Sequence, residues 1–173
     1  KRKDGDYPAV KNYFQSLVKK LFPMKPGESA KIENLELLAT KAMHYAPNVG
    51  YVLKYNGMKV GYPADGSYYS GQERAYEGCD VLILNVPWPK GYGAPKNIHM
   101  AIDDAIALVR AIGRKPKLVI LSHLGPAMLR SNLFKQEKIL ADATKCKVIS
   151  ASDFMELDLD TLKTRILKPA VKF

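Results

Sequence analysis

The fold is decided by one apolar stretch, Val81-Leu82-Ile83-Leu84-Asn85-Val86, in which nearly every side chain is of a kind that proteins bury. A continuous run of this length is typical of a strand that is covered on both faces, as in a parallel sheet. Similar strands are predicted at 117–122 and 147–150, and helical patterns lie between them at 101–112 and 132–145. This alternation of strands and helices predicts an α/β domain whose sheet is buried under helices.

Working back towards the amino terminus, a hairpin precedes this strand. Two runs of strand-forming residues, 50–55 and 58–62, flank Asn56-Gly57, a dipeptide that suits a two-residue turn with positive φ at both positions. Residues 30–43 are interpreted as two further strands that end at His44. The apolar spacing between Val10 and Leu21 predicts a helix over 10–22, which ends before Pro23.

Composition sets the class of protein. The chain has 173 residues, 47% of them hydrophobic, with 27 Lys and Arg against 17 Asp and Glu, so its formal charge is +10. These values exclude a disordered, collagen-like or disulfide-based chain and indicate one soluble domain over 1–173. We expect a linker-like start at 1–9, the helix at 10–22, a core at 27–160 with a short last strand at 155–159, and a tail at 161–173 that forms a surface helix.

The remaining global features concern location and partners. No apolar run approaches the length that a bilayer requires and no signal segment opens the chain, so we expect a cytoplasmic protein without a membrane partner. Cys79 and Cys146 follow no disulfide spacing and fit buried thiols in a reducing compartment. The positive charge favours polyanionic partners. Because the sequence starts at Lys1 rather than Met, we interpret it as part of a longer protein.

Three histidines are present, and each is predicted at the edge of a helix or strand. His44 ends a strand, His99 opens a helix and His123 follows the strand at 117–122, while Asp65 ends the second hairpin strand. Ligands collect at such strand ends in α/β proteins. A single histidine is more often solvated or packed in a core, but His44, Asp65 and His123 together favour a metal site.

The local contexts of these residues resemble the metallo-β-lactamase superfamily. His44-Tyr45-Ala46-Pro47-Asn48-Val49-Gly50-Tyr51, the hairpin, and then Tyr62-Pro63-Ala64-Asp65-Gly66 are similar to its third and fourth metal motifs, and Leu121-Ser122-His123-Leu124-Gly125 is similar to the last one. Asn97-Ile98-His99-Met100 resembles the histidine-led helix start of phosphodiesterase-like members. The resemblance covers roughly 27 to 160 and implies an αββα sandwich of the metallo-β-lactamase type, with this chain as its C-terminal half.

One departure is clear. The superfamily's His-x-His-x-Asp-His cluster is absent, because no histidine precedes His44. Three protein ligands are too few for two zinc ions, even where water completes the coordination. We therefore expect the missing N-terminal half to come from an upstream segment or a separate polypeptide, and an exposed sheet edge to favour a homo-oligomer otherwise. The competing interpretation is a non-catalytic homologue.

The resemblance also implies roles for individual residues. His44 would bind one of two divalent metal ions, zinc or manganese, His123 the other, and Asp65 would bridge them. A metal-activated water would then hydrolyse a phosphodiester, in a nucleic acid or a nucleotide. Asp65 and His99 are the expected catalytic residues, with His99 contacting a phosphoryl oxygen or protonating the leaving group. Alternatively, His99 only caps the helix beside Asn97.

The loop at 87–96 leads to His99 and has two interpretations. Trp88 and Tyr92 could stack a base while lysines hold a phosphate, or the prolines could make the loop a rigid crossover. Tyr68, shortly after Asp65, is a further candidate for substrate contact. Two other functions stay open beside phosphodiester hydrolysis: a basic nucleic-acid-binding or scaffold module that lost its metals, and hydrolysis of a thioester or lactam. A phosphate-binding loop, a CxxC pair and a nucleophile elbow are all absent.

Overall fold

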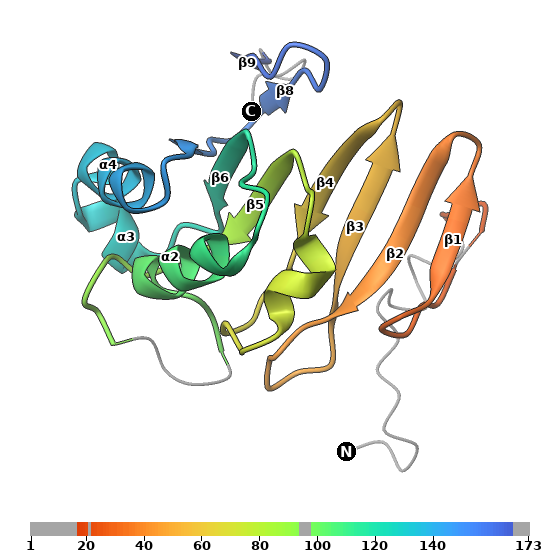
Figure 1. The fold of residues 1–173 in the computed structure, drawn as a ribbon, viewed down its shortest axis with the longest axis horizontal. Coiled ribbons are helices and arrows are strands. Elements are labelled where there is room, and N and C mark those ends of the chain that lie inside the picture. Colours follow the sequence, from red (N-terminus) through yellow and green to blue (C-terminus); the bar gives the residue numbers. More distant parts are fainter. Residues whose placement is uncertain (1–16, 21, 94–97, 168–173) are drawn as a thin grey trace.

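A mixed sheet of seven strands forms the centre of the computed structural model, which describes residues 17–20, 22–93 and 98–167. The strands follow one another across the sheet in chain order (Figure 1). They are β1 (Ser29–Ile32), β2 (Leu35–Lys41), β3 (Val49–Tyr55), β4 (Met58–Tyr62), β5 (Val81–Asn85), β6 (Leu118–Ser122) and β7 (Lys147–Ser150). β1 to β4 pair antiparallel, whereas β4 to β7 pair parallel. The predicted α/β class is confirmed.

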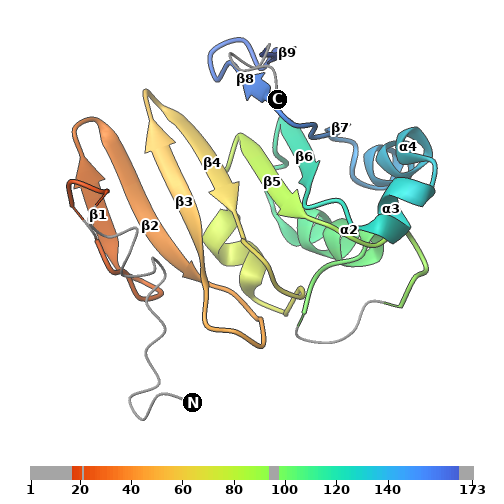
Figure 2. The same cartoon turned by 180° about the vertical axis from the view of Figure 1, so that it is seen from behind.

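Helices pack on one face of this sheet. They are the 3₁₀ helix η1 (Gln72–Tyr76) and the α-helices α2 (Ile102–Ala111), α3 (Pro126–Arg130) and α4 (Leu133–Thr144). A small hairpin of β8 (Met155–Leu157) and β9 (Thr164–Ile166) follows β7. Within the described residues no helix covers the opposite face of the sheet (Figure 2). The helices are also too short or too polar to cross a membrane, over the ranges given above.

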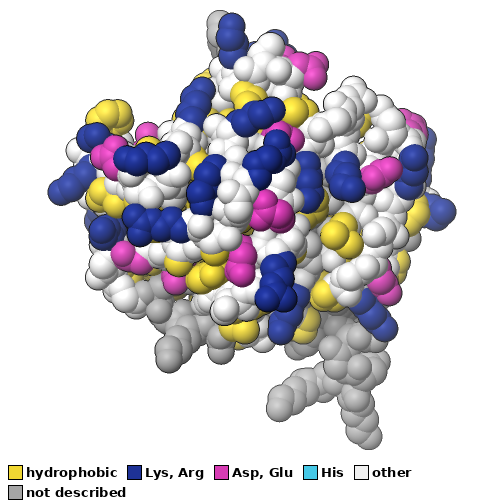
Figure 3. All heavy atoms as spheres, viewed as in Figure 1, with side chains coloured by type: hydrophobic (Ala, Val, Ile, Leu, Met, Phe, Trp, Pro, Cys, Tyr) yellow, Lys and Arg dark blue, Asp and Glu magenta, His cyan; other side chains and the backbone are white. Residues whose placement is uncertain are grey.

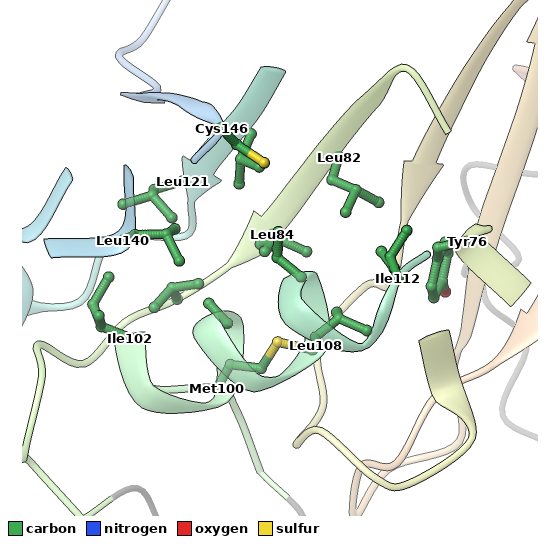
Figure 4. Packing of buried hydrophobic residues seen from close by; sticks show 14 of the residues in the cluster. Tyr76, Leu82, Leu84, Met100, Ile102, Leu108, Ile112, Leu121, Leu140 and Cys146 are labelled. Atoms are coloured by element: carbon green, nitrogen blue, oxygen red, sulfur yellow. The ribbon is translucent and has the colours of Figure 1, made fainter. Parts of the chain in front are cut away.

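The larger core lies between β5, β6 and the helices (Figure 4). Leu82 and Leu84 of β5 point into it beside Leu108 of α2, and all three are fully buried. Val81 belongs to a second cluster with Leu118 and Ile120 on the other face, against which the β8–β9 hairpin packs. β5 is therefore buried on both sides, which is why its sequence reads as a continuous apolar run.

The β3–β4 turn and the two cysteines match the sequence expectations. Asn56 and Gly57 both have positive φ, 46° and 79°, as a two-residue hairpin turn requires. Cys79 and Cys146 are free, buried thiols. Burial raises the pKa of Cys79 to about 11, so the thiol is protonated and unreactive at neutral pH.

Three boundary predictions need correction. The predicted helix at 10–22 is not formed at 17–20, which contains a turn and a bend, and its earlier part lies outside the described residues. The tail at 161–173 is not helical where it is described, because residues 164–166 form β9 against β8. The strand predicted at 155–159 ends at Leu157. The turn that leads to β9 begins at residue 159.

Candidate metal centre

Four chemically suited side chains meet beyond the carboxyl ends of β5 and β6. His44 lies in the β2–β3 connection, Asp65 shortly after β4, His99 just before α2 and His123 directly after β6. The sequence predicted that these strand ends would share one edge, and they do. Such an edge is rigid because each loop is anchored by a buried strand.

A close backbone contact brings the His44 loop to the Asp65 loop. The Ser67 amide donates to the Met43 carbonyl at 2.9 Å, and a Cβ on Gly66 would lie 2.9 Å from that same oxygen. Only glycine permits this approach. The Asn48 side chain adds a second link, since its Nδ2 donates to the Asp65 carbonyl oxygen at 2.9 Å. These contacts fix His44 and Asp65 relative to each other.

The side-chain geometry centres on the Asp65 carboxylate. Nδ1 of His99 lies 3.7 Å from its Oδ1, and Nε2 of His123 lies 4.0 Å from the same oxygen. His44, Asp65 and His99 each offer one donor atom, and these atoms lie within 4.8 Å of one another. The His99 ring centre lies 5.4 Å from that of His44 and 4.9 Å from that of His123. The compact donor group is therefore His44, Asp65 and His99 rather than the predicted His44, Asp65 and His123, and His123 lies beside it.

Asn85 positions the carboxylate, and sequence reasoning missed this role. Its Nδ2 donates to Asp65 Oδ1 at 2.7 Å and to the Tyr62 hydroxyl at 3.0 Å. Asn85 is buried at the end of β5. A polar residue inside the apolar run Val81 to Val86 was the available signal, because a buried amide needs a partner.

The His99 side chain is 17% exposed, against 50% for that of His123. Its Nδ1 is buried and has no hydrogen-bond partner among the described residues. Burial lowers its pKa, and His123 and His44 lower it further, although Asp65 acts in the opposite direction. His99 lies outside the helix that it was expected to open, because the N-cap of α2 is Ala101, whose amide donates to Asp104. The alternative that His99 caps this helix is therefore wrong, and Asn97 lies outside the described residues.

The other two histidines present their rings differently. Nδ1 of His44 lies 3.2 Å from the Ala46 amide and 3.3 Å from the Ala46 carbonyl oxygen, so these two backbone groups hold the ring in place without selecting one tautomer. His123 has a φ of 52°, which is unusual for a residue with a side chain, and its side chain is half-exposed. Strained backbone of this kind often occurs at functional sites.

The predicted substrate-contacting residues divide into two groups. The Trp88 ring meets His99 edge to face at 5.6 Å and so borders the site, and Tyr92 stacks on Trp88 at 5.9 Å. Tyr68 instead donates its hydroxyl to Glu73 at 3.3 Å and packs against the core. Substrate contact by Trp88, Tyr92 and Tyr68 stays a prediction.

The donor set fits a divalent metal ion. Imidazole nitrogen and carboxylate oxygen are suitable ligands for zinc, manganese or iron, and the two cysteines are buried elsewhere in the core. The unpartnered Nδ1 of His99 is a further sign, because a buried polar atom needs a partner. Among the described residues, no Lys or Arg pairs with Asp65. Its negative charge is available to a cation.

A family model described as the β-lactamase superfamily domain matches residues 4–124. The chain belongs to the metallo-β-lactamase superfamily, as the sequence motifs implied.

Individual relatives extend over more sequence than this chain. Uncharacterized protein MJ1374 of Methanocaldococcus jannaschii is 26% identical over 157 residues, which cover 90% of this chain and 58% of that protein. The metallo-β-lactamase fold protein YhfI from Bacillus subtilis has a TM-score of 0.71 at 19% identity, over 83% of this chain and 59% of YhfI. Human tRNase Z, short form, has a TM-score of 0.56 at 18% identity, over 75% of this chain and 45% of its own. The chain thus spans less than three-fifths of each.

Proposed function

We propose that this chain forms part of a metal-dependent hydrolase that cleaves phosphate esters. The observation that carries the proposal is the convergence of three imidazoles on the Asp65 carboxylate, with donor atoms of His44, Asp65 and His99 within 4.8 Å of one another. When bound there, divalent metal ions would lower the pKa of a water and neutralise charge on a phosphoryl group.

The residues of the chain take distinct parts in this proposal. His44 and His123 would hold metal through imidazole nitrogens, and Asp65, oriented by the 2.7 Å hydrogen bond from Asn85, would supply the carboxylate ligand. His99 lies 3.7 Å from Asp65 and close to both other histidines. Burial favours its neutral form, which acts as a metal ligand or hydrogen-bonds to a phosphoryl oxygen.

Phosphate esters are favoured over lactams and thioesters by charge. The chain carries a formal charge of +10, which attracts polyanions, whereas a neutral thioester or lactam gains nothing from it. The similarity of fold to human tRNase Z, short form, supports the same choice. Nucleic acid or nucleotide is therefore the proposed substrate class.

We further propose that another segment or chain completes the centre. The four donor side chains are fewer than two zinc ions need, since each prefers about four ligands. The relatives matched here are also longer, because the chain covers 58% of the M. jannaschii protein and 59% of YhfI. The chain alone is expected to hold about one ion, and the completed centre two.

Metal content and hydrolysis test the proposal together. Protein loaded with zinc or manganese and then dialysed is analysed for bound metal, and bis(p-nitrophenyl) phosphate hydrolysis is measured on the completed centre. Asp65→Ala should lose metal and activity. Asp142→Ala, which removes an exposed carboxylate from α4, is the matched control and should retain both. Protein that retains no metal after loading and dialysis would contradict the proposal, and salt-sensitive binding of polynucleotide by that metal-free protein would then favour the binding module.

A further inference from the structure

An open cavity begins at His123, at the border of the metal centre. It has a volume of about 510 Å³, within the range of about 300–1,000 Å³ that is usual for small-molecule sites. Its lining comes from the segment after β6, from α3, from the start of α4 and from the segment after β7. His123 belongs to both places, since it lines the cavity and its Nε2 lies 4.0 Å from Asp65 Oδ1. A substrate bound at the metal centre can therefore extend into this cavity.

Buried residues and a backbone hydrogen bond hold the walls of the cavity in place. Met128 is fully buried and anchors α3, while its neighbour Leu129 is 59% exposed and lines the cavity. The Ala151 amide donates to the Leu121 carbonyl at 2.7 Å, and this bond fixes the segment after β7 beside the end of β6. The walls are therefore formed before any ligand binds.

Three leucines give the cavity an apolar wall. Leu124 and Leu133 are partly buried and pack against the core, whereas Leu129 is mostly exposed. A single exposed leucine is ordinary on a protein surface. Three leucines that line one cavity beside a metal centre instead form a surface for an apolar group.

The charges of the cavity disfavour a phosphate group. Figure 3 shows Lys and Arg side chains spread over the face on which α2 and α4 lie, yet no Lys or Arg is among the described residues that line the cavity. Asp153 does line it, and this exposed residue forms no ion pair with another described residue. Its carboxylate would repel a phosphate. The cavity therefore suits the organic part of a phosphate ester.

Asp153 also indicates which organic group fits. An ionised carboxylate only accepts hydrogen bonds, so the group beside it must donate them. The two adjacent hydroxyl groups of a ribose can do so, and the hydroxyl groups of Ser122 and Ser152, which also line the cavity, can pair with further polar atoms. The base attached to that ribose has a flat face that can lie on the leucines.

We propose that this cavity binds the ribonucleoside group of a small phosphodiester, with the base on the leucines and the ribose hydroxyls on Asp153. The inference rests on the proposed function, within which it selects a nucleotide over an internal segment of a nucleic acid strand. In a strand, the next phosphate replaces a ribose hydroxyl and would face Asp153. The cavity thus favours a nucleoside that is esterified at its 5′ position and keeps its 2′ and 3′ hydroxyls.

Binding of adenosine, which carries no phosphate, tests this proposal on the metal-free chain in EDTA. The leucine methyl groups are labelled with carbon-13, and their NMR signals are followed as adenosine is added. Signals of Leu124, Leu129 and Leu133 should shift together, and shifts confined to other leucines would overturn the proposal. Leu129→Ser should weaken the affinity about fivefold, because it removes apolar contact area. Ile166→Ser, at a residue of β9 that is 60% exposed, is the matched control and should leave the affinity unchanged.

The ribose hydroxyls supply a second readout. 2′,3′-Dideoxyadenosine should bind about tenfold more weakly than adenosine, because it lacks both donors to the carboxylate. Asp153→Ala should abolish this difference, whereas Asp142→Ala, at an exposed carboxylate of α4, should keep it. Equal affinity of the unchanged chain for the two nucleosides would overturn the proposal. Tighter binding of adenosine 3′-monophosphate than of adenosine 5′-monophosphate would overturn it as well.

These measurements are separate from metal binding and hydrolysis, because EDTA removes the metal. A chain that binds adenosine in the cavity but retains no metal after loading would contradict the proposed function and leave the nucleoside site standing. A chain that retains metal but does not bind adenosine would leave the proposed function standing and overturn the nucleoside site. Thermal unfolding of each variant checks that it is folded.

Discussion

β5 has an aspartate near each end, and the two aspartates have opposite surroundings. Asp80, just before β5, accepts a hydrogen bond from the Lys59 amide at 3.0 Å and pairs with Arg114 and Lys117. Asp65, beside the other end, receives one amide from Asn85 and otherwise faces imidazoles at 3.7 and 4.0 Å. The Asp80 side chain is 7% exposed and that of Asp65 is 34% exposed.

The difference distinguishes a structural carboxylate from a ligand-binding one. Fixed cations and a backbone amide compensate the charge of Asp80, so it joins β4, β5 and the segment after α2 into one unit. Asp65 pairs with no Lys or Arg among the described residues, and the imidazoles of His44, His99 and His123 lie near it. Only the second arrangement leaves negative charge for a metal ion.

The strongest test of this comparison makes the same substitution at each of the two aspartates. Asp65→Asn should weaken zinc binding by at least about 100-fold, because it removes a charged ligand, whereas Asp80→Asn should leave zinc affinity unchanged. Isothermal titration calorimetry with zinc measures both. Equal losses of affinity in the two variants would show that the metal binds elsewhere or that folding, not ligation, was disturbed.

The positioning role of Asn85 gives the next largest effect. Asn85→Ala removes the hydrogen bond to Asp65 Oδ1 and should weaken metal affinity about 10- to 100-fold. Tyr62→Phe is the matched control, since it removes the other partner of the Asn85 amide and keeps the contact with Asp65. If Tyr62→Phe lowers the affinity as much as Asn85→Ala, loss of local packing explains both results.

Substitution of Asp80 should instead change the free energy of unfolding. Burial alone would raise the pKa of Asp80, but the hydrogen bonds from Lys59 and Lys117 outweigh it, so the pKa lies below its usual value. A carboxylate with a depressed folded pKa stabilises the fold above its unfolded pKa of about 3.9, and this stabilisation is lost as pH falls through the folded pKa.

Asp80→Asn should therefore lower the free energy of unfolding by about 2 kcal/mol at neutral pH. The difference from the wild-type chain should shrink below about pH 4, as the wild-type carboxylate becomes protonated. Urea unfolding between pH 3 and pH 7 measures it. A constant difference across this range would mean that the charge of Asp80 contributes nothing.

The sequence predicted the strands of the sheet better than it predicted the contacts between side chains, and the functional roles of His44, Asp65, His99 and His123 stay predictions. β5, β6, α4 and the Asn56-Gly57 hairpin were found because their patterns are local. The role of Asn85 was missed because its partner, Asp65, is distant in sequence. The placement of His99 before α2, rather than in it, depends on Ala101 and Asp104, whose hydrogen bond could not be assigned from spacing alone.

The exposed ion pair between Lys138 and Asp142 provides a weak ion pair with which the ion pairs of Asp80 can be compared. Its 3.0 Å separation is about that of Lys117 and Asp80, 3.1 Å, but both of its side chains are 64% exposed. Water screens such pairs, so a double-mutant cycle with Lys138→Gln and Asp142→Asn should give less than about 0.5 kcal/mol of coupling. The coupling should vanish in 1 M salt, whereas the corresponding cycle at Lys117 and Asp80 should keep most of its value. Equal coupling energies would mean that burial of Asp80 does not strengthen its ion pairs, and the distinction between the two ends of β5 would then rest on the histidines alone.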